Sequence, residues 1–191
     1  MTELTLTAEE RNAVLRRNIA LIGFMGVGKT TTSARLRDLL GMDEAETDAL
    51  IIEREGRSIT QIFAEKGEPY FRQVETQTIL ELQDRTGLII SCGGGVAMRQ
   101  VNVDNLRKGS CIVLLTASPE TILGRVGHST DRPLLNGHMN VEYIADLMEK
   151  RRPFYEAAAD LTVATDGRSA DEICVEIVQR IISLQKAEGV G

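Results

Sequence analysis

Long apolar runs and an excess of basic residues are both missing from this 191-residue sequence. No segment approaches the roughly 20 apolar residues of a membrane-spanning helix. The N-terminal segment MTELTLTAEER lacks the positive region and apolar run of a secretory signal. The net charge of −6 disfavours a general role on nucleic acids or membrane surfaces, although it permits a local basic pocket. We therefore expect a cytoplasmic protein that binds neither nucleic acid nor membranes.

Cysteine and histidine are also scarce. The three cysteines, Cys92, Cys111 and Cys174, are far apart and form no Cys-x-x-Cys pair, so we expect reduced thiols rather than a disulfide framework. The two histidines, His128 and His138, are too isolated to suggest a metal site. The sequence has no internal repeat or linker-like stretch, and 42% hydrophobic and 26% charged residues are typical of one globular domain.

Short β-rich apolar runs alternate with amphipathic segments. The runs at residues 18–22, 88–91 and 111–115 predict buried strands, and residues 161–164 predict a weaker one. A further strand is expected within GMDEAETD (41–48), although it has little apolar character. This alternation predicts an α/β fold, in which helices cover both faces of a parallel sheet and ligands bind at the carboxyl ends of the strands.

Three helix starts carry capping signals. Thr7 with Glu10 and Ser169 with Glu172 match the capping box, in which the two side chains bond each other's backbone N–H groups. Ser118 followed by a proline places a cap before the first helical position.

The segment GFMGVGKT (23–30) matches the phosphate-binding pattern G-x-x-x-x-G-K-[ST], after a predicted strand and before a predicted helix. Glycines let the backbone N–H groups approach phosphates closely, Lys29 supplies a positive charge, and the Thr30 hydroxyl is suited to binding Mg²⁺. The alternative is a glycine-rich turn with an incidental Lys-Thr. The expected ATP-binding residues of this loop are Gly26, Val27, Gly28, Lys29, Thr30 and Thr31.

Two large classes of phosphate-loop proteins are disfavoured. A GTPase needs Asn-Lys-x-Asp for guanine, which is absent, and a motor or transport ATPase needs an apolar strand that ends in Asp. Here the strand at residues 88–91 runs into a cysteine and three glycines instead. Phosphoryl transfer to a small molecule remains.

Five places in order resemble the shikimate kinase family, over nearly the whole chain from residue 18 to 182. They are GFMGVGKTT (23–31), Glu46-Thr47-Asp48, FRQVE (71–75), Gly93-Gly94-Gly95, and the pair RPLL (132–135) and RRPFY (151–155). The resemblance implies phosphorylation of the 3-hydroxyl of shikimate by magnesium ATP. It also implies a nucleoside monophosphate kinase fold with a five-stranded parallel sheet. We expect one kinase domain at 18–188, with a substrate-binding helical segment at 48–75 and a lid at 124–138, after an N-terminal extension at 1–17.

The resemblance assigns the substrate carboxylate to Arg72 and Arg151, and a guanidinium can bond a carboxylate through two parallel hydrogen bonds. The alternative for Arg72 is a surface ion pair with Glu75, and both interpretations can hold. The alternative for Arg151 is a solvated charge run at 150–152, where only the Arg-x-Pro-x-Tyr spacing favours Arg151 over Arg152.

Asp48 is expected to accept hydrogen bonds from the substrate hydroxyls and to act in catalysis, although loose phosphoryl transfer needs little base help. The alternative interpretation is that Asp48 caps the N-terminus of a helix at 49–53. Gly93, Gly94 and Gly95 end a buried strand and leave room for substrate against the backbone; a plain turn is the alternative.

In the expected lid, the resemblance implies that Arg132 reaches the transferring phosphoryl group and that Arg125 stacks on adenine. The alternative is a surface loop with two solvated arginines.

The family usually has Asp-x-Asp where this chain has Glu46-Thr47-Asp48. In that family the first acid normally holds Mg²⁺ through water, so the resemblance makes Thr30 and Glu46 the expected metal residues. Lys29, Asp48 and Arg132 are the expected catalytic residues.

Two other functions stay open. One is a kinase of another small hydroxy acid, such as gluconate; the other is a catalytically silent nucleotide-binding module. The expected partners are shikimate and ATP, and the expected oligomeric state is a monomer.

Overall fold

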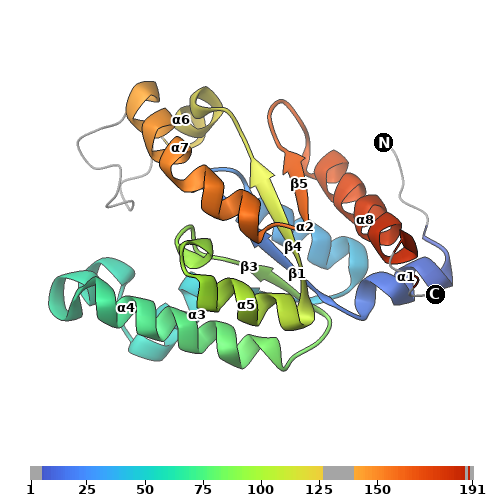
Figure 1. Cartoon of the computed structure of the whole chain (residues 1–191), viewed down its shortest axis with the longest axis horizontal. Helices are drawn as coiled ribbons and strands as arrows, with labels where there is room; N and C mark the ends of the chain where they lie inside the picture. Colours follow the sequence, from blue (N-terminus) through green and yellow to red (C-terminus); the bar gives the residue numbers. More distant parts are fainter. Residues whose placement is uncertain (1–5, 127–139, 188, 190–191) are drawn as a thin grey trace.

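Five parallel strands form the centre of the protein, in the order β2–β3–β1–β4–β5 (Figure 1). The computed structural model describes residues 6–126, 140–187 and 189, except for the side chains of residues 9, 11 and 13. The strands are β1 (Asn18–Ile22), β2 (Asp43–Glu46), β3 (Leu88–Ser91), β4 (Ser110–Thr116) and β5 (Leu161–Ala164). The predicted α/β class is therefore confirmed, and β4 is one residue longer at each end than expected.

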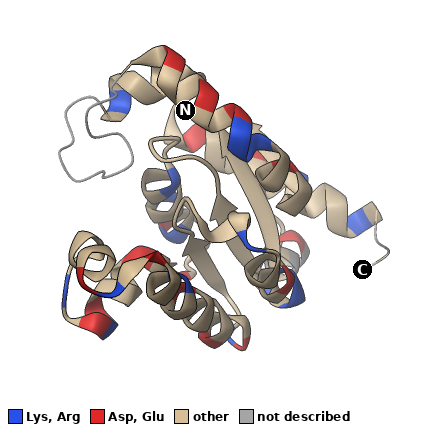
Figure 2. Ribbon diagram, turned by 60° about the vertical axis from the view of Figure 1, so that its left-hand side comes forward, with Lys and Arg blue, Asp and Glu red and all other residues tan. Residues whose placement is uncertain are grey.

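Burial explains why most strands are readable as apolar runs. Every residue of β1 and β3 is buried, and β4 is buried except at its last residue. These strands and β5 contain no charged residue and are tan in Figure 2, whereas the charges lie mainly on the helices. A strand covered on both faces has no polar side to alternate with.

The exception is β2, which lies at the edge of the sheet and reads DEAE. Its Ala45 is buried, while Glu44 and Glu46 face helix α2 (Lys29–Leu40). Arg37 donates to Glu44 at 3.0 Å, and Thr30 donates to Glu46 at 3.1 Å. The expected strand is confirmed, and its acidic character follows from these contacts with α2.

Helices cover both faces of the sheet (Figure 1). On one face lie α1 (Ala8–Leu15), α2 and α8 (Ala170–Ala187), where α8 packs against both α1 and α2. On the other lie α5 (Gln100–Gly109), α7 (Val141–Ala158) and the later part of α4 (Ile59–Gln83). The expected caps are present: the hydroxyl oxygens of Thr7, Ser118 and Ser169 accept hydrogen bonds from the backbone N–H groups of residues 10, 121 and 172. Within the described ranges, no helix has the length and apolar character needed to cross a bilayer.

A smaller lobe projects from the sheet and consists of α3 (Thr47–Glu55) and the first part of α4 (Figure 1). It has its own apolar cluster of Ile51, Ile62, Phe71 and Val74. Helix α4 is broken at Gly67, whose φ of 80° and ψ of 167° are not helical. The break turns the chain just before Arg72, so it sets the direction from which that side chain approaches the site.

The expected lid at 124–138 begins within helix α6 (Pro119–Val126), so Arg125 belongs to a helix rather than to a surface loop. The loop in that alternative is therefore wrong for Arg125, although the residue is exposed. Residues 127–138, including Arg132, lie outside the described residues.

Candidate active site

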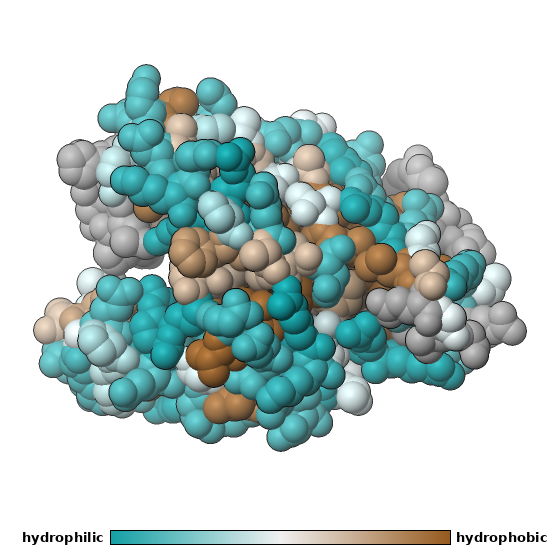
Figure 3. Space-filling view, in the orientation of Figure 1, coloured by the Kyte–Doolittle hydropathy of each residue, from teal (hydrophilic) through white to brown (hydrophobic). Residues whose placement is uncertain are grey.

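A cavity of about 1050 Å³ opens at the carboxyl ends of the strands. One wall is the phosphate loop and the start of α2, and the other is formed by α3, α4 and the triple glycine. In Figure 3 the surface is notched between the α3–α4 lobe and the part that carries α6 and α7. Every expected site residue within the described ranges lines this cavity, so motifs spread from residue 26 to 151 meet in one place.

The phosphate loop takes the conformation that its glycines permit. Gly26 and Gly28 have φ of 79° and 100°, and Gly28 is the N-cap of α2. A side chain on Gly26 would also meet Val126 at 2.6 Å. The first turn of α2 has no acidic residue, so its N–H groups present a positive end to the cavity. Lys29 Nζ donates to the carbonyl oxygens of Gly23 and Phe24 at 2.9 and 3.0 Å, which holds its charge over the loop.

Thr30 and Glu46 meet across the gap between α2 and β2, where Thr30 Oγ1 donates to Glu46 Oε1 at 3.1 Å. The described residues contain no cluster of three or more His, Cys, Asp or Glu that could enclose a metal ion. Two oxygen ligands beside a phosphate loop nevertheless fit Mg²⁺, which keeps several waters and binds substrate phosphates. The glutamate is long enough to reach the threonine hydroxyl, so the substitution of Glu for Asp keeps the oxygen pair together.

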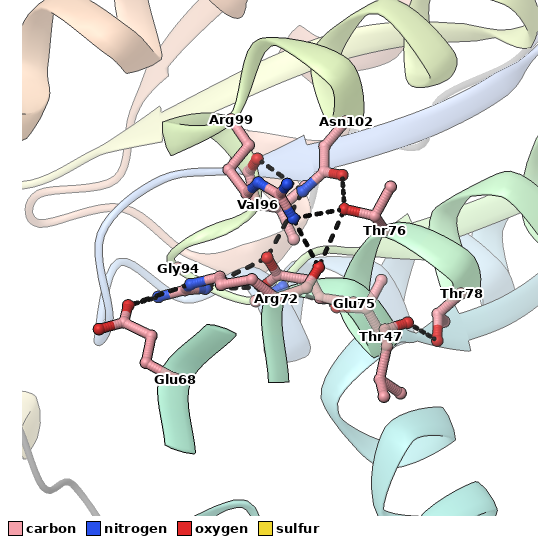
Figure 4. Close-up of polar contacts among 12 residues, drawn as sticks. Thr47, Glu68, Arg72, Glu75, Thr76, Thr78, Gly94, Val96, Arg99 and Asn102 are labelled. Atoms are coloured by element: carbon pink, nitrogen blue, oxygen red, sulfur yellow. Dashed lines mark hydrogen bonds and ion pairs between the residues drawn. The ribbon is translucent and has the colours of Figure 1, made fainter. Parts of the chain in front are cut away.

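Arg72 lies between two carboxylates on its own helix (Figure 4). Its Nη1 donates to both oxygens of Glu75 at 3.0 and 3.2 Å, and its Nε and Nη2 donate to Glu68 at 3.2 and 3.0 Å. The ion pair with Glu75 is confirmed, but it is buried, since Glu75 is only 1% exposed. Arg72 therefore forms the ion pair with Glu75 and lines the cavity at the same time.

The charges of this pair affect each other's pKa. Burial raises the pKa of Glu75 above its ordinary value, and the opposing charge of Arg72 only partly offsets this. Burial alone would lower the pKa of Arg72, but the charge of Glu75 and the hydrogen bond to Glu68 outweigh it and raise that pKa. Arg72 therefore stays protonated and is held in one orientation at the cavity.

Arg151 and Arg152 are clearly distinguished. The Arg151 guanidinium lies 5.7 Å from the centre of the Phe24 ring and lines the cavity. Arg152 is largely exposed and pairs with Glu149 on its own helix. Two residues further on, the Tyr155 hydroxyl donates to the carbonyl oxygen of Gly94 at 2.6 Å, which fastens α7 to the triple glycine. Burial raises the pKa of this tyrosine, so the hydroxyl keeps its proton.

The glycines at 93 and 95 leave space that other protein side chains fill. A Cβ on Gly93 would run into the Asp48 carboxylate, and one on Gly95 into the Arg72 guanidinium. The Thr47 hydroxyl accepts a hydrogen bond from the backbone N–H of Gly93 at 2.8 Å. Because α3 starts at Thr47 with Glu46 as N-cap, Asp48 lies in its first turn, and the N-cap alternative for Asp48 is wrong.

Arg125 bridges the phosphate loop and the segment before α8. Its Nη1 donates to the carbonyl oxygen of Val27 at 3.1 Å and to the Thr165 hydroxyl at 3.0 Å. Its Nη2 donates to the carbonyl oxygen of Thr165 at 3.1 Å. Thr165 and the neighbouring Arg168 also line the cavity, although neither is predicted from the sequence. Neither residue lies in a recognisable motif, and only the fold brings them to the loop.

A phosphate loop after β1, the strand order 2–3–1–4–5, and acidic and arginine side chains on the facing wall define a P-loop phosphotransferase for small molecules. A sequence model of the shikimate kinase family matches residues 25–182. The chain belongs to the shikimate kinase family. It is a phosphotransferase that uses ATP and catalyses the shikimate kinase step of aromatic amino acid biosynthesis.

Individual relatives agree with this assignment. The chain is 41% identical over 175 residues to a shikimate kinase from Dehalococcoides mccartyi, and this alignment covers 92% of this chain and 99% of that protein. It is similar to the solved structure of a shikimate kinase from Acinetobacter baumannii in complex with shikimate, with a TM-score of 0.86 and 32% identity. That match covers 92% of this chain and 98% of the other.

A gluconokinase structure from Sinorhizobium meliloti also matches, with a TM-score of 0.58 and 18% identity over 91% of this chain and 98% of that one. At this identity the likeness shows a shared fold and nothing of the substrate.

Proposed function

We propose that the two walls of the cavity divide the substrates, with ATP on the phosphate loop and shikimate on the wall formed by α3, α4 and the triple glycine. The observation that carries this proposal is that Lys29 and Thr30 line the same cavity as Asp48, Arg72 and Arg151. A phosphate donor and an anionic acceptor can therefore lie side by side, and holding reactants together is most of what phosphoryl transfer requires.

On the ATP side, the backbone N–H groups of residues 26–31 would bind the phosphates, and Lys29 would stabilise charge on the transferring group. Arg125 lies beside Val27 and Thr165, which suits a role next to the adenine. The role of Arg132 at the transferring phosphoryl group remains an expectation from the family resemblance.

On the shikimate side, Arg72 and Arg151 would bind the carboxylate, and Asp48 would accept hydrogen bonds from the hydroxyl groups. Glu68 and Glu75 support this because they fix the orientation of Arg72, and Phe24 flanks Arg151. The Acinetobacter baumannii relative, solved in complex with shikimate, has a similar overall fold, with a TM-score of 0.86.

We also propose that Thr30 and Glu46 hold Mg²⁺ beside the phosphate loop. When bound, the metal neutralises charge on the phosphate oxygens. Thr30 and Glu46 contribute by presenting adjacent oxygens at the 3.1 Å contact between α2 and β2.

The carboxylate assignment is tested with an uncharged substrate analogue. Arg151→Ala should raise the KM for shikimate much more than the KM for shikimate methyl ester, because only shikimate carries the charge that the arginine recognises. Arg152→Ala is the matched control, since this neighbouring arginine is exposed. Equal effects of Arg151→Ala on both substrates would refute the assignment.

An assay of ADP release with shikimate and with gluconate tests the two other functions, a gluconate kinase and a catalytically silent nucleotide-binding module. A gluconate kinase would prefer gluconate over shikimate, and a silent module would release no ADP in response to either. We further propose that a single chain at 18–188 forms the complete catalytic domain in a cytoplasmic monomer, with the substrate-binding segment at 48–75. Sedimentation of the protein with both substrates tests the monomer.

A further inference from the structure

A buried hydrogen-bond network on α5 reaches Arg72 through Glu75 (Figure 4). Its central residue is Asn102, which is fully buried. Asn102 Nδ2 donates to Glu75 Oε2 at 3.4 Å and to the carbonyl oxygen of Val96 at 3.2 Å. Its Oδ1 accepts from the Thr76 hydroxyl at 2.8 Å. The amide group of Asn102 is thus engaged on both sides, which fixes its orientation.

Glu75 transmits this orientation to Arg72. Both Glu75 oxygens accept from Arg72 Nη1, and the same carboxylate accepts from Asn102. Since Glu75 is 1% exposed, water has little access to replace a lost donor. Without the Asn102 amide, the carboxylate would turn toward its remaining partners and take the guanidinium with it.

A second contact fixes the backbone at the same place. Arg99, the N-cap of α5, donates from Nη1 to the carbonyl oxygen of Arg72 at 2.7 Å and to the Thr76 hydroxyl at 2.9 Å. Arg99 follows closely after the triple glycine in sequence. The start of α5 therefore holds α4 at a fixed distance from the glycine wall of the cavity.

We propose that Asn102 is a positioning residue, which orients Arg72 for the carboxylate of shikimate by fixing Glu75. This inference rests on the proposed role of Arg72 as a carboxylate ligand. Asn102 itself lies behind Glu75 and acts only through it.

The first test compares two asparagines of the same helix. Asn102→Ala should raise the KM for shikimate roughly tenfold, as expected for a lost hydrogen bond to a charged group, with kcat and the KM for ATP little changed. Asn105→Ala is the matched control, because Asn105 is also buried on α5 but accepts its hydrogen bond from Lys108 on the same helix. Equal changes in the two variants would overturn the proposal.

The second test uses Asn102→Asp, which keeps the shape of the side chain. The new carboxylate would face Glu75. The other charges that act on Glu75 are Arg72 on α4, Arg99 at the start of α5 and Asp48 on α3. Two neighbouring carboxylates favour sharing one proton, which preserves the hydrogen bond at low pH and loses it as the pH rises. The KM for shikimate should therefore rise with pH in this variant and not in the parent protein, while the KM for ATP shows no such step.

The outcomes separate this proposal from the one it rests on. If Arg72→Ala leaves the KM for shikimate unchanged, the proposed role of Arg72 fails. If Arg72→Ala raises that KM and neither Asn102 variant does, the positioning role fails alone. Loss of folding in both Asn102 variants, seen by circular dichroism, would assign the residue to the core and also overturn the positioning role.

Discussion

Replacing Arg72 by alanine should cost both stability and substrate affinity, and the structure allows the two losses to be separated. Arg72 donates two hydrogen bonds to Glu75, whose side chain is 1% exposed. Removing one partner of a buried ion pair typically costs 3–5 kcal/mol. Because Arg72 keeps 22% exposure, water can partly replace it, and we expect a loss near the lower end, about 3 kcal/mol.

The loss in affinity has a different origin. A charge-assisted hydrogen bond to the substrate carboxylate contributes roughly 1.5–3 kcal/mol. At about 1.4 kcal/mol for each factor of ten, this predicts a KM for shikimate that rises roughly 10- to 150-fold, with the KM for ATP little changed.

A double variant distinguishes the two effects. In Arg72→Ala/Glu75→Gln the unpaired buried carboxylate is gone, so most of the lost free energy of unfolding should return while the KM for shikimate stays high. Stability is measured by urea unfolding followed by circular dichroism, and affinity by steady-state kinetics. A double variant with a restored KM would refute the reasoning, because it would make Arg72 a purely structural residue.

Four further predictions follow from the site. Lys29→Ala should lower kcat by two to three powers of ten, roughly 3–4 kcal/mol, with the fold intact by circular dichroism; near-native turnover would contradict its role. Glu46→Ala should raise the Mg²⁺ concentration for half-maximal rate about 10–100-fold, and Glu46→Asp should not; an unchanged titration for Glu46→Ala would place the carboxylate away from the metal. Gly95→Ala should weaken shikimate binding in calorimetry because its Cβ meets Arg72, whereas Gly124→Ala, with open space around it, should not. Finally, burial raises the pKa of Glu75, so the free energy of unfolding should fall relative to that of Glu75→Gln as the pH rises from about 4.5 through the pKa of the folded state. A difference in unfolding free energy that stays constant across that range would contradict the buried charge.

The sequence alone predicts a structural feature correctly where the residues that form it are adjacent in the chain. The phosphate loop is one such case, because strand, glycines, Lys29 and helix follow one another within a single segment. The buried strands were equally readable, since both their faces need apolar side chains. Even β2 was correctly expected from its place in the chain, although its acidic residues reflect contacts with α2 that no local pattern reveals.

The remaining features depend on residues brought together by the fold. Tyr155 reaches Gly94 across 61 positions, and Asn102 reaches Glu75 across 27. The break of α4 at Gly67 is local, but nothing in the sequence indicated that the helix resumes in a new direction just before Arg72. The choice of Arg151 over Arg152 rested on spacing, and the structure adds a physical reason, because only Arg151 lies at the cavity beside Phe24.

The central claim is that this cavity transfers a phosphoryl group from ATP to shikimate. The most direct measurement is ADP release by the full chain with ATP and Mg²⁺, in the absence of acceptor and with shikimate or gluconate. Identification of the phosphorylated product by mass spectrometry accompanies it. We predict release that depends on shikimate, with one shikimate phosphate formed for each ADP and far slower turnover of gluconate. ADP release that shikimate does not stimulate, or equal turnover of gluconate, would contradict the account.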